Sequence, residues 1–158
     1  MTPTDPSAGN PAVDLARRFL DGLQAMDIDA ALACFARDAV QEMPFAPPGF
    51  PSRLDGIDAL RRQYGGLPDA YASMRFDITA ILPMEDPQWA LLEYHGTIAQ
   101  RDGSRYDNDY AGLFHVADGA IVLFREYFNP LVLQAAFGGD KLDATFSLPS
   151  QQDATAQQ

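Results

Sequence analysis

The spacing of apolar residues changes once along the chain, from a helical period in the first half to a period of two from Ser73 onward. An apolar stripe through Val13, Phe19 and Leu23 predicts a first helix over residues 11–26. Shorter stretches predict further helices over 28–36, 56–64 and 130–137, and a strand over 39–45. The alternating stretches predict four more strands, over 73–82, 89–98, 105–116 and 120–128.

The order of these elements, with helices first and then strands joined by short turns, is typical of an α+β domain with helices on one face of an antiparallel sheet. A chain of 158 residues with 47% hydrophobic residues can form one domain with its own core. We expect that domain to span residues 11–137, and we expect the polar ends, 1–10 and 150–158, to be flexible tails.

The last predicted strand is apolar on both of its faces. Simple alternation separates its side chains into two sets, one with Ile121, Leu123 and Tyr127 and one with Val122, Phe124 and Phe128. A sheet that helices cover on one face ordinarily has a polar second face. We therefore expect a second copy of the chain to cover the outer face, which carries the set with Ile121, Leu123 and Tyr127, and this predicts a homodimer.

Charge and motifs narrow the classes of partner. The net charge of -11 would repel nucleic acid and anionic membranes, so we expect neither as a partner. We find no apolar run long enough to span a bilayer and no signal-peptide pattern, and we expect a cytoplasmic protein. The sequence contains no glycine-rich phosphate loop and no paired cysteines, so we expect no nucleotide or redox cofactor.

Three local patterns carry a family resemblance. They are Phe35-Ala36-Arg37-Asp38-Ala39-Val40 leading to Met43-Pro44-Phe45, then Tyr106-Asp107-Asn108-Asp109-Tyr110, and finally Arg125-Glu126-Tyr127-Phe128-Asn129-Pro130. Their order and spacing resemble the nuclear transport factor 2-like superfamily, and within it the SnoaL-like and ketosteroid isomerase-like branch. Limonene epoxide hydrolases and phenazine-biosynthesis proteins of this fold are also similar. The resemblance covers about residues 11–137. It implies an α+β barrel, in which three N-terminal helices close a conical, strongly curved mixed or antiparallel sheet around a pocket for a small, largely apolar ligand.

Glu126 is the first candidate for chemistry. It lies between Phe124 and Phe128 on one face of the last strand, and a carboxylate on an apolar inward face loses hydration. Lost hydration raises the carboxyl pKa and makes the group a proton shuttle near neutral pH. The resemblance implies the same role, because relatives commonly place an acid, a base or a water activator at the matching position. A structural ion pair is the alternative, although Arg125 points to the opposite face.

The strand over 89–98 supplies the next candidates. Glu93 and His95 share one face with Trp89 and Thr97. The resemblance to limonene epoxide hydrolases matches Glu93 and His95 to an arginine and an aspartate that line the pocket of those enzymes, so we expect this face to line the pocket here. His95 could then hold a neighbouring carboxylate ionised, because histidine titrates near neutral pH. Alternatively, it could bond within the sheet.

Glu42 matches a water-holding asparagine in the epoxide hydrolase pattern, and Val40 matches the accompanying tyrosine. These departures, together with Glu93 and His95, argue against epoxide hydrolysis by that mechanism. If Glu42, Glu93, His95 and Glu126 converged, three neighbouring carboxylates would share a proton or attract a cation. We expect no metal, because the resemblance implies chemistry without one. Glu42 could also be a solvated strand residue.

Polar and apolar lining residues complete the candidate site. Asn108 and Tyr110 share a face of the third long strand and could donate hydrogen bonds to a ligand carbonyl or enolate, or could simply pack in the sheet. Phe124, Phe128 and Leu133 are expected to supply apolar lining.

Two functions from different classes follow from this site. The first is an enzyme in which a pocket carboxylate performs acid/base chemistry of the isomerase, cyclase, dehydratase (lyase) or hydrolase type on a small, largely apolar carbonyl compound. The second is a non-catalytic dimeric protein that binds an apolar ligand in the same pocket.

Overall fold

The computed structural model describes residues 7–146, with side-chain surroundings described through residue 138. The tail expected over 150–158 and most of the one expected over 1–10 lie outside the described residues. Ser7 and Asn10 are both buried, so the folded region begins before Pro11. The Asn10 side chain accepts a hydrogen bond from the Val13 amide at 3.0 Å, which caps the first helix.

In the part of the chain that the structure describes, four helices precede the long strands. Helix α1 spans Pro11–Gln24, α2 spans Ile28–Leu32, α3 spans Ile57–Gly65 and α4 spans Leu67–Ala70. A fifth helix, α5, spans Pro130–Phe146 and is broken at Gly138, whose φ of 61° lies in the left-handed region. None of these helices is long and apolar enough to cross a membrane.

Within residues 7–146, six strands form one mixed sheet in the order β2-β1-β6-β5-β4-β3. Strands β3 (Tyr71–Pro83), β4 (Trp89–Gln100), β5 (Arg105–Ala117) and β6 (Ala120–Phe128) form the antiparallel meander that the alternation predicts. Strand β1 (Phe35–Glu42) pairs parallel to β6, and the short β2 (Arg53–Asp55) pairs antiparallel to β1. The sheet is open, because β2 and β3 are its two edges.

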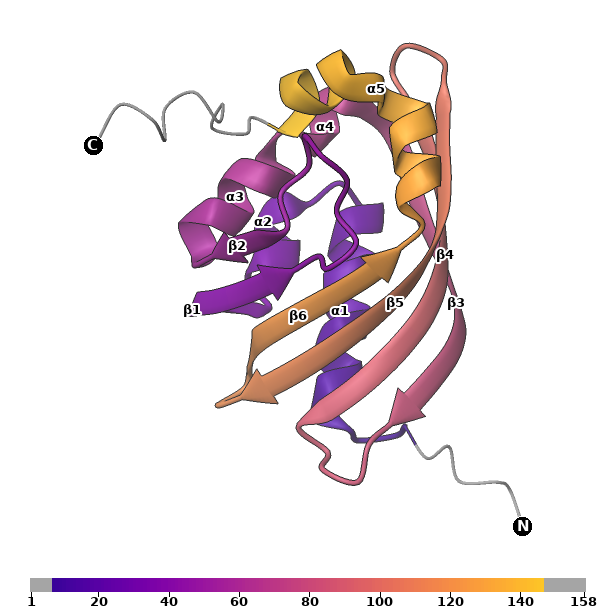
Figure 1. The fold of residues 1–158 in the computed structure, drawn as a ribbon. Helices are drawn as coiled ribbons and strands as arrows, with labels where there is room; N and C mark the ends of the chain where they lie inside the picture. Colours follow the sequence, from indigo (N-terminus) through magenta and orange to yellow (C-terminus); the bar gives the residue numbers. More distant parts are fainter. Residues whose placement is uncertain (1–6, 147–158) are drawn as a thin grey trace.

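The sheet curves around α1, and the other helices close one end of the resulting cone (Figure 1). We call the face toward α1 the inner face and the opposite one the outer face. Phe19 of α1 packs edge-on against Phe35 and Phe124, with ring centroids 5.0 and 5.4 Å apart, and Phe124 stacks on Phe114 at 4.5 Å. These rings form a dry core at one end of the cone and leave the other end for a cavity.

The fold class predicted from the sequence is confirmed, and the boundaries differ where local geometry intervenes. Phe35 and Ala36 begin β1 instead of extending α2, and α5 continues beyond 137. Ile121 was predicted on the outer face of β6, and this prediction is wrong because the residue is fully buried. The register between β5 and β6 shifts by one residue at Val122, which turns both Ile121 and Phe124 inward.

Candidate functional site

A cavity of about 80 Å³ lies between the inner face of the sheet and the helices. Its wall is mostly aliphatic and aromatic, and every element of the cone except α2 and β2 contributes to it. The described lining residues are Leu23, Gln41, Met43, Phe50, Gln63, Tyr64, Leu67, Tyr71, Met74, Phe76, Ile98, Tyr106, Tyr110, Glu126, Phe128 and Leu133. Among them, only Glu126 can carry a charge near neutral pH.

Glu126 lies on the inner face of β6 and lines this cavity, as the alternation with Phe124 and Phe128 predicts. Its Oε2 accepts a hydrogen bond of 2.5 Å from the hydroxyl of Tyr94, which stands on the inner face of β4. Burial raises the pKa of Glu126 to about 7, and the Tyr94 hydrogen bond lowers it by a smaller amount. At neutral pH the carboxyl group is therefore present in both its protonated and its ionised form.

Tyrosines supply most of the other polar groups of the cavity. The Tyr64 hydroxyl donates to Oε1 of Gln41 at 2.8 Å. The hydroxyls of Tyr106 and Tyr110, both on β5, lie 3.1 Å apart. Burial raises the pKa of Tyr64 and Tyr110 well above the ordinary value and that of Tyr106 to about 12. These hydroxyls are therefore neutral hydrogen-bond donors.

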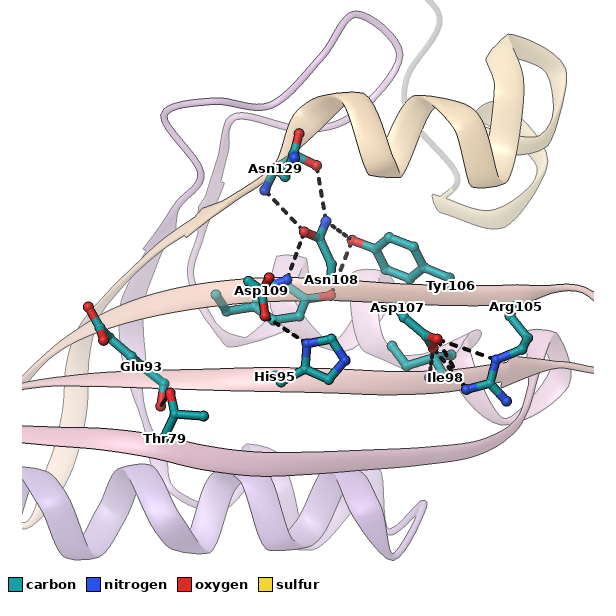
Figure 2. A network of polar contacts seen from close by, with 11 residues as sticks. Thr79, Glu93, His95, Ile98, Arg105, Tyr106, Asp107, Asn108, Asp109 and Asn129 are labelled. Atoms are coloured by element: carbon teal, nitrogen blue, oxygen red, sulfur yellow. Dashed lines mark hydrogen bonds and ion pairs between the residues drawn. The ribbon is translucent and has the colours of Figure 1, made fainter.

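The face of strand β4 that points toward the cavity is not the face that we predicted. Tyr94, Gly96 and Ile98 point inward, so Trp89, Glu93, His95 and Thr97 lie on the outer face, and the prediction that they line the pocket is wrong. The Nδ1 atom of His95 lies 2.7 Å from Oδ1 of Asp109, within hydrogen-bond distance (Figure 2). The Trp89 ring stacks on His115 at a centroid distance of 4.0 Å.

Glu42 also points away from the cavity. Its two carboxylate oxygens accept hydrogen bonds from Arg53 at 3.0 Å and Arg125 at 2.6 Å on the outer face. Gln41, the preceding residue, takes the inner position instead. The four groups considered for convergence, Glu42, Glu93, His95 and Glu126, are thus not brought together. Within residues 7–146 no group of three or more His, Cys, Asp or Glu is placed to hold a metal ion.

Some of the remaining predicted residues line the cavity, and the others are buried beside it. Tyr110, Phe128 and Leu133 line the cavity. Phe124 belongs to the dry core beside it, so its prediction as a lining residue is wrong. Asn108 is 3% exposed and also lies outside the wall, because its side chain is bonded to Tyr106 and to the backbone of Asn129.

Sequence reasoning missed Tyr64, Tyr94, Tyr106 and Gln41. Tyr106 shares a face with Asn108 and Tyr110 at a spacing of two, and this signal could have identified it. Tyr94 follows Glu93, so choosing the other face of β4 would have found it. Nothing in the local pattern marks Tyr64, because the turn of α3 against β1 brings it to the cavity.

The fold and the cavity define an NTF2-like cone, and comparison with known proteins specifies the family. The chain belongs to the SnoaL-like domain family, whose model matches residues 16–124. It is 32% identical to an uncharacterized PhzA/B-like protein of Pseudomonas aeruginosa over 106 residues, which cover 66% of this chain and 74% of the relative.

Two solved structures extend the comparison. The crystal structure of a Bacillus subtilis protein for which an isomerase activity is suggested superposes with a TM-score of 0.74 at 27% identity, covering 84% of this chain and 96% of that one. The Δ5-3-ketosteroid isomerase from Mycobacterium sp. superposes with a TM-score of 0.66 at 22% identity, covering 75% and 93%. The second similarity establishes the shared fold.

Proposed function

We propose that this protein is a cofactor-independent acid/base enzyme in which Glu126 moves a proton on a small, neutral, largely apolar carbonyl compound. The observation that carries the proposal is the position of Glu126. It is the one group in the described cavity wall that can exchange a proton at neutral pH, and burial has brought its pKa to about 7.

The geometry leaves one carboxylate oxygen for a substrate. Tyr94 holds Oε2, so Oε1 is the atom that would remove a proton from the carbon next to a carbonyl group and return it to the same or another carbon. This reaction is a proton transfer that needs no co-reactant. Isomerisation follows directly from it. Cyclisation or dehydration would start from the same enol or enolate.

The electrostatics of the wall favour a neutral substrate. The described lining contains no lysine, arginine or histidine, and Glu126 becomes negative when it ionises. A carboxylate or phosphate ligand would therefore be buried without a partner charge, which is costly. The isomerase among the solved structures of this fold is consistent with this class of chemistry.

Hydrogen-deuterium exchange at carbon tests the proposal without knowledge of the natural substrate. The probe is 2-tetralone in D₂O, whose protons next to the carbonyl are acidic enough to exchange by enolisation. We expect the protein to accelerate the exchange, and we expect Glu126→Gln to reduce that acceleration by at least about 100-fold, since general-base catalysis contributes this much. The control variant, Glu85→Gln, replaces an exposed carboxylate in the turn between β3 and β4 and should retain the acceleration.

A wild-type protein that binds 2-tetralone and does not accelerate its exchange would overturn the enzymatic role. That result would favour the alternative, a protein of the same fold that binds an apolar ligand without reaction. Acceleration that survives in the Glu126→Gln variant would show that another group is the base.

We also propose that the outer face forms a homodimer. Leu82, Leu91 and Leu113 occupy paired positions across β3, β4 and β5 on this face, and Leu82 is 47% exposed. An apolar row of this kind on an exposed sheet face is typical of a protein interface. Sedimentation of the wild-type protein at micromolar concentration should show a dimer, and sedimentation of Leu113→Glu should show a monomer. The control, Leu131→Glu on α5, should remain a dimer. A wild-type monomer would contradict the proposal.

A further inference from the structure

The orientation of the Asn108 side chain is fixed by its partners. Its Oδ1 lies 2.9 Å from the amide nitrogen of Asp109 and 3.2 Å from that of Asn129. Both amides can only donate, so this end of the side chain must be the carbonyl oxygen. Nδ2 then donates to the carbonyl oxygen of Asn129 and to the hydroxyl of Tyr106, both at 3.0 Å (Figure 2). Tyr106 Oη is therefore an acceptor for Asn108.

One of the two hydroxyl protons of Tyr106 and Tyr110 has no acceptor among the described residues. The hydroxyls of Tyr106 and Tyr110 carry two protons, and one of them makes the 3.1 Å bond between the two oxygens. If Tyr110 donates in this bond, the proton of Tyr106 remains. If Tyr106 donates, the proton of Tyr110 remains. Among the residues that the structure describes, neither hydroxyl has another acceptor within hydrogen-bond distance, and both rings line the cavity.

The remaining hydroxyl proton, on Tyr106 or on Tyr110, belongs to a ring that lines the cavity. A hydroxyl proton left without an acceptor in a largely apolar cavity costs free energy, and an acceptor atom on a bound ligand would remove that cost. The pair also stays protonated at every physiological pH, because burial raises the pKa of Tyr106 to about 12 and that of Tyr110 well above its ordinary value. The pair is therefore suited to donate to an acceptor atom of a bound molecule.

We infer that the Tyr106–Tyr110 hydroxyl pair is a binding subsite that donates one hydrogen bond to the oxygen of a neutral carbonyl ligand, with Asn108 as its positioning residue. The inference deepens the proposed function and rests on it for the presence of a carbonyl ligand in this cavity. It does not depend on whether Glu126 reacts, because Glu126 is bonded to Tyr94 and not to this pair.

The proton count gives the subsite an unusual signature in mutants. Tyr106→Phe leaves the Tyr110 proton unpaired, and Tyr110→Phe leaves the Tyr106 proton unpaired. Each single variant thus keeps one donor, and only the double variant removes it. The double variant should therefore lose much more affinity for a carbonyl ligand than the two single variants lose together. If one hydroxyl acted independently, its single variant would already show the whole loss.

Binding of two probes of the same shape isolates the donor. The probes are 2-tetralone and tetralin, which lacks the carbonyl oxygen, and the measured quantity is the ratio of their Kd values for each full-length variant. We expect the double Tyr106→Phe/Tyr110→Phe variant to worsen the ratio for 2-tetralone by about tenfold, the effect of leaving one buried acceptor unpaired. Each single variant should change it less than about threefold. Tyr71→Phe removes another hydroxyl from the same wall and serves as the matched control.

Several outcomes would overturn the subsite. An unchanged ratio in the double variant, a full loss in either single variant, or a loss in Tyr71→Phe alone would each contradict it. If neither probe binds saturably, both the subsite and the ligand cavity are wrong. If the double variant does not fold, the test uses the wild-type protein and the ¹³C chemical shift of 2-tetralone labelled at its carbonyl carbon. Bound to the wild-type protein, that resonance should lie downfield of its position in hexane, and a hexane-like position would refute the hydrogen bond.

The failure of this inference is distinguishable from the failure of the proposed function. Glu126→Gln should reduce the acceleration of exchange by at least about 100-fold and leave the ratio of Kd values within about threefold. A protein that shows no exchange and still loses its carbonyl preference in the double variant would keep the subsite and lose the catalytic role of Glu126. The opposite result would keep Glu126 and lose the subsite.

Discussion

Replacing Glu126 with glutamine should make the domain more stable at pH 8 and leave its stability nearly unchanged at pH 4. The glutamine carbonyl can still accept the hydrogen bond from Tyr94, so the packing around the cavity is retained. The variant differs from the wild-type protein chiefly in that it cannot ionise.

The size of the effect follows from the pKa of Glu126. Burial raises that pKa from 4.5 to about 7 in the folded protein, which corresponds to roughly 3 kcal/mol between the two protonation states. Between pH 4.5 and 7 the unfolded chain has lost this proton and the folded protein keeps it. The unfolded state therefore binds fewer protons, and the stability contributed by the protonated group falls as the pH rises through this window.

Urea unfolding at pH values from 4 to 8 measures the effect as a difference between the two proteins, in which the other titrating groups cancel. We expect the difference in unfolding free energy to grow by about 3 kcal/mol in favour of Glu126→Gln across this range. Glu85→Gln removes the same charge from the exposed turn between β3 and β4 and should retain the pH dependence of the wild-type protein. A difference between wild type and Glu126→Gln that stays constant with pH would refute the reasoning.

Three further predictions concern Glu126, Asn108 and the packing of the first two helices. Tyr94→Phe removes the hydrogen bond that lowers the pKa of Glu126, so the midpoint of the pH-rate profile for 2-tetralone exchange should move upward, and a downward shift would contradict this role. Asn108→Ala breaks the bonds that join β5 to the start of α5 and should lower the unfolding free energy by about 2–3 kcal/mol in urea titration, where a change below about 0.5 kcal/mol would count against it. Gly22→Ala should cost about 1–3 kcal/mol by the same measurement, because an added Cβ would lie 2.7 Å from the backbone nitrogen of Ala31, and a neutral effect would show that α1 and α2 separate freely.

The fold could be predicted from the sequence because its signals are redundant. The helical stripe of α1, the two-residue period of the meander and the order of the elements all indicate the same α+β arrangement. The inward position of Glu126 could be predicted as well, because Phe124 and Phe128 on the same face of β6 are clearly apolar. The single charged group among them then stands out.

The inner face of β4 could not be chosen in this way. Both faces of this strand carry large apolar side chains, with Trp89 and Leu91 on one and Leu92 and Tyr94 on the other. Alternation defines two sets of residues, and it does not say which set is buried, so an error of one residue exchanges the faces. Gly96 is a signal of the correct face, because a Cβ there would lie 2.9 Å from the Tyr110 ring.

The positions of the cavity tyrosines are also beyond sequence reasoning, for a different reason. Tyr64, Tyr94 and the pair of Tyr106 and Tyr110 come from α3, β4 and β5, and they approach the cavity or Glu126 only after the sheet has curved around α1. The role of Asn108 depends on its bonds to the backbone of Asn129, which lies 21 residues further along the chain. Hydrogen bonds of this kind depend on tertiary structure, and no periodic pattern in the sequence indicates them.

Direct titration of the Glu126 carboxyl tests the central claim most closely. The protein is labelled with ¹³C at the glutamate side-chain carboxyl, the resonance of Glu126 is assigned by its absence in Glu126→Gln, and its chemical shift is followed from pH 3 to 9. The position of this carboxyl in the cavity predicts a midpoint near 7. A midpoint near 4.5, the ordinary value for glutamate, would contradict the claim that Glu126 is a buried proton shuttle.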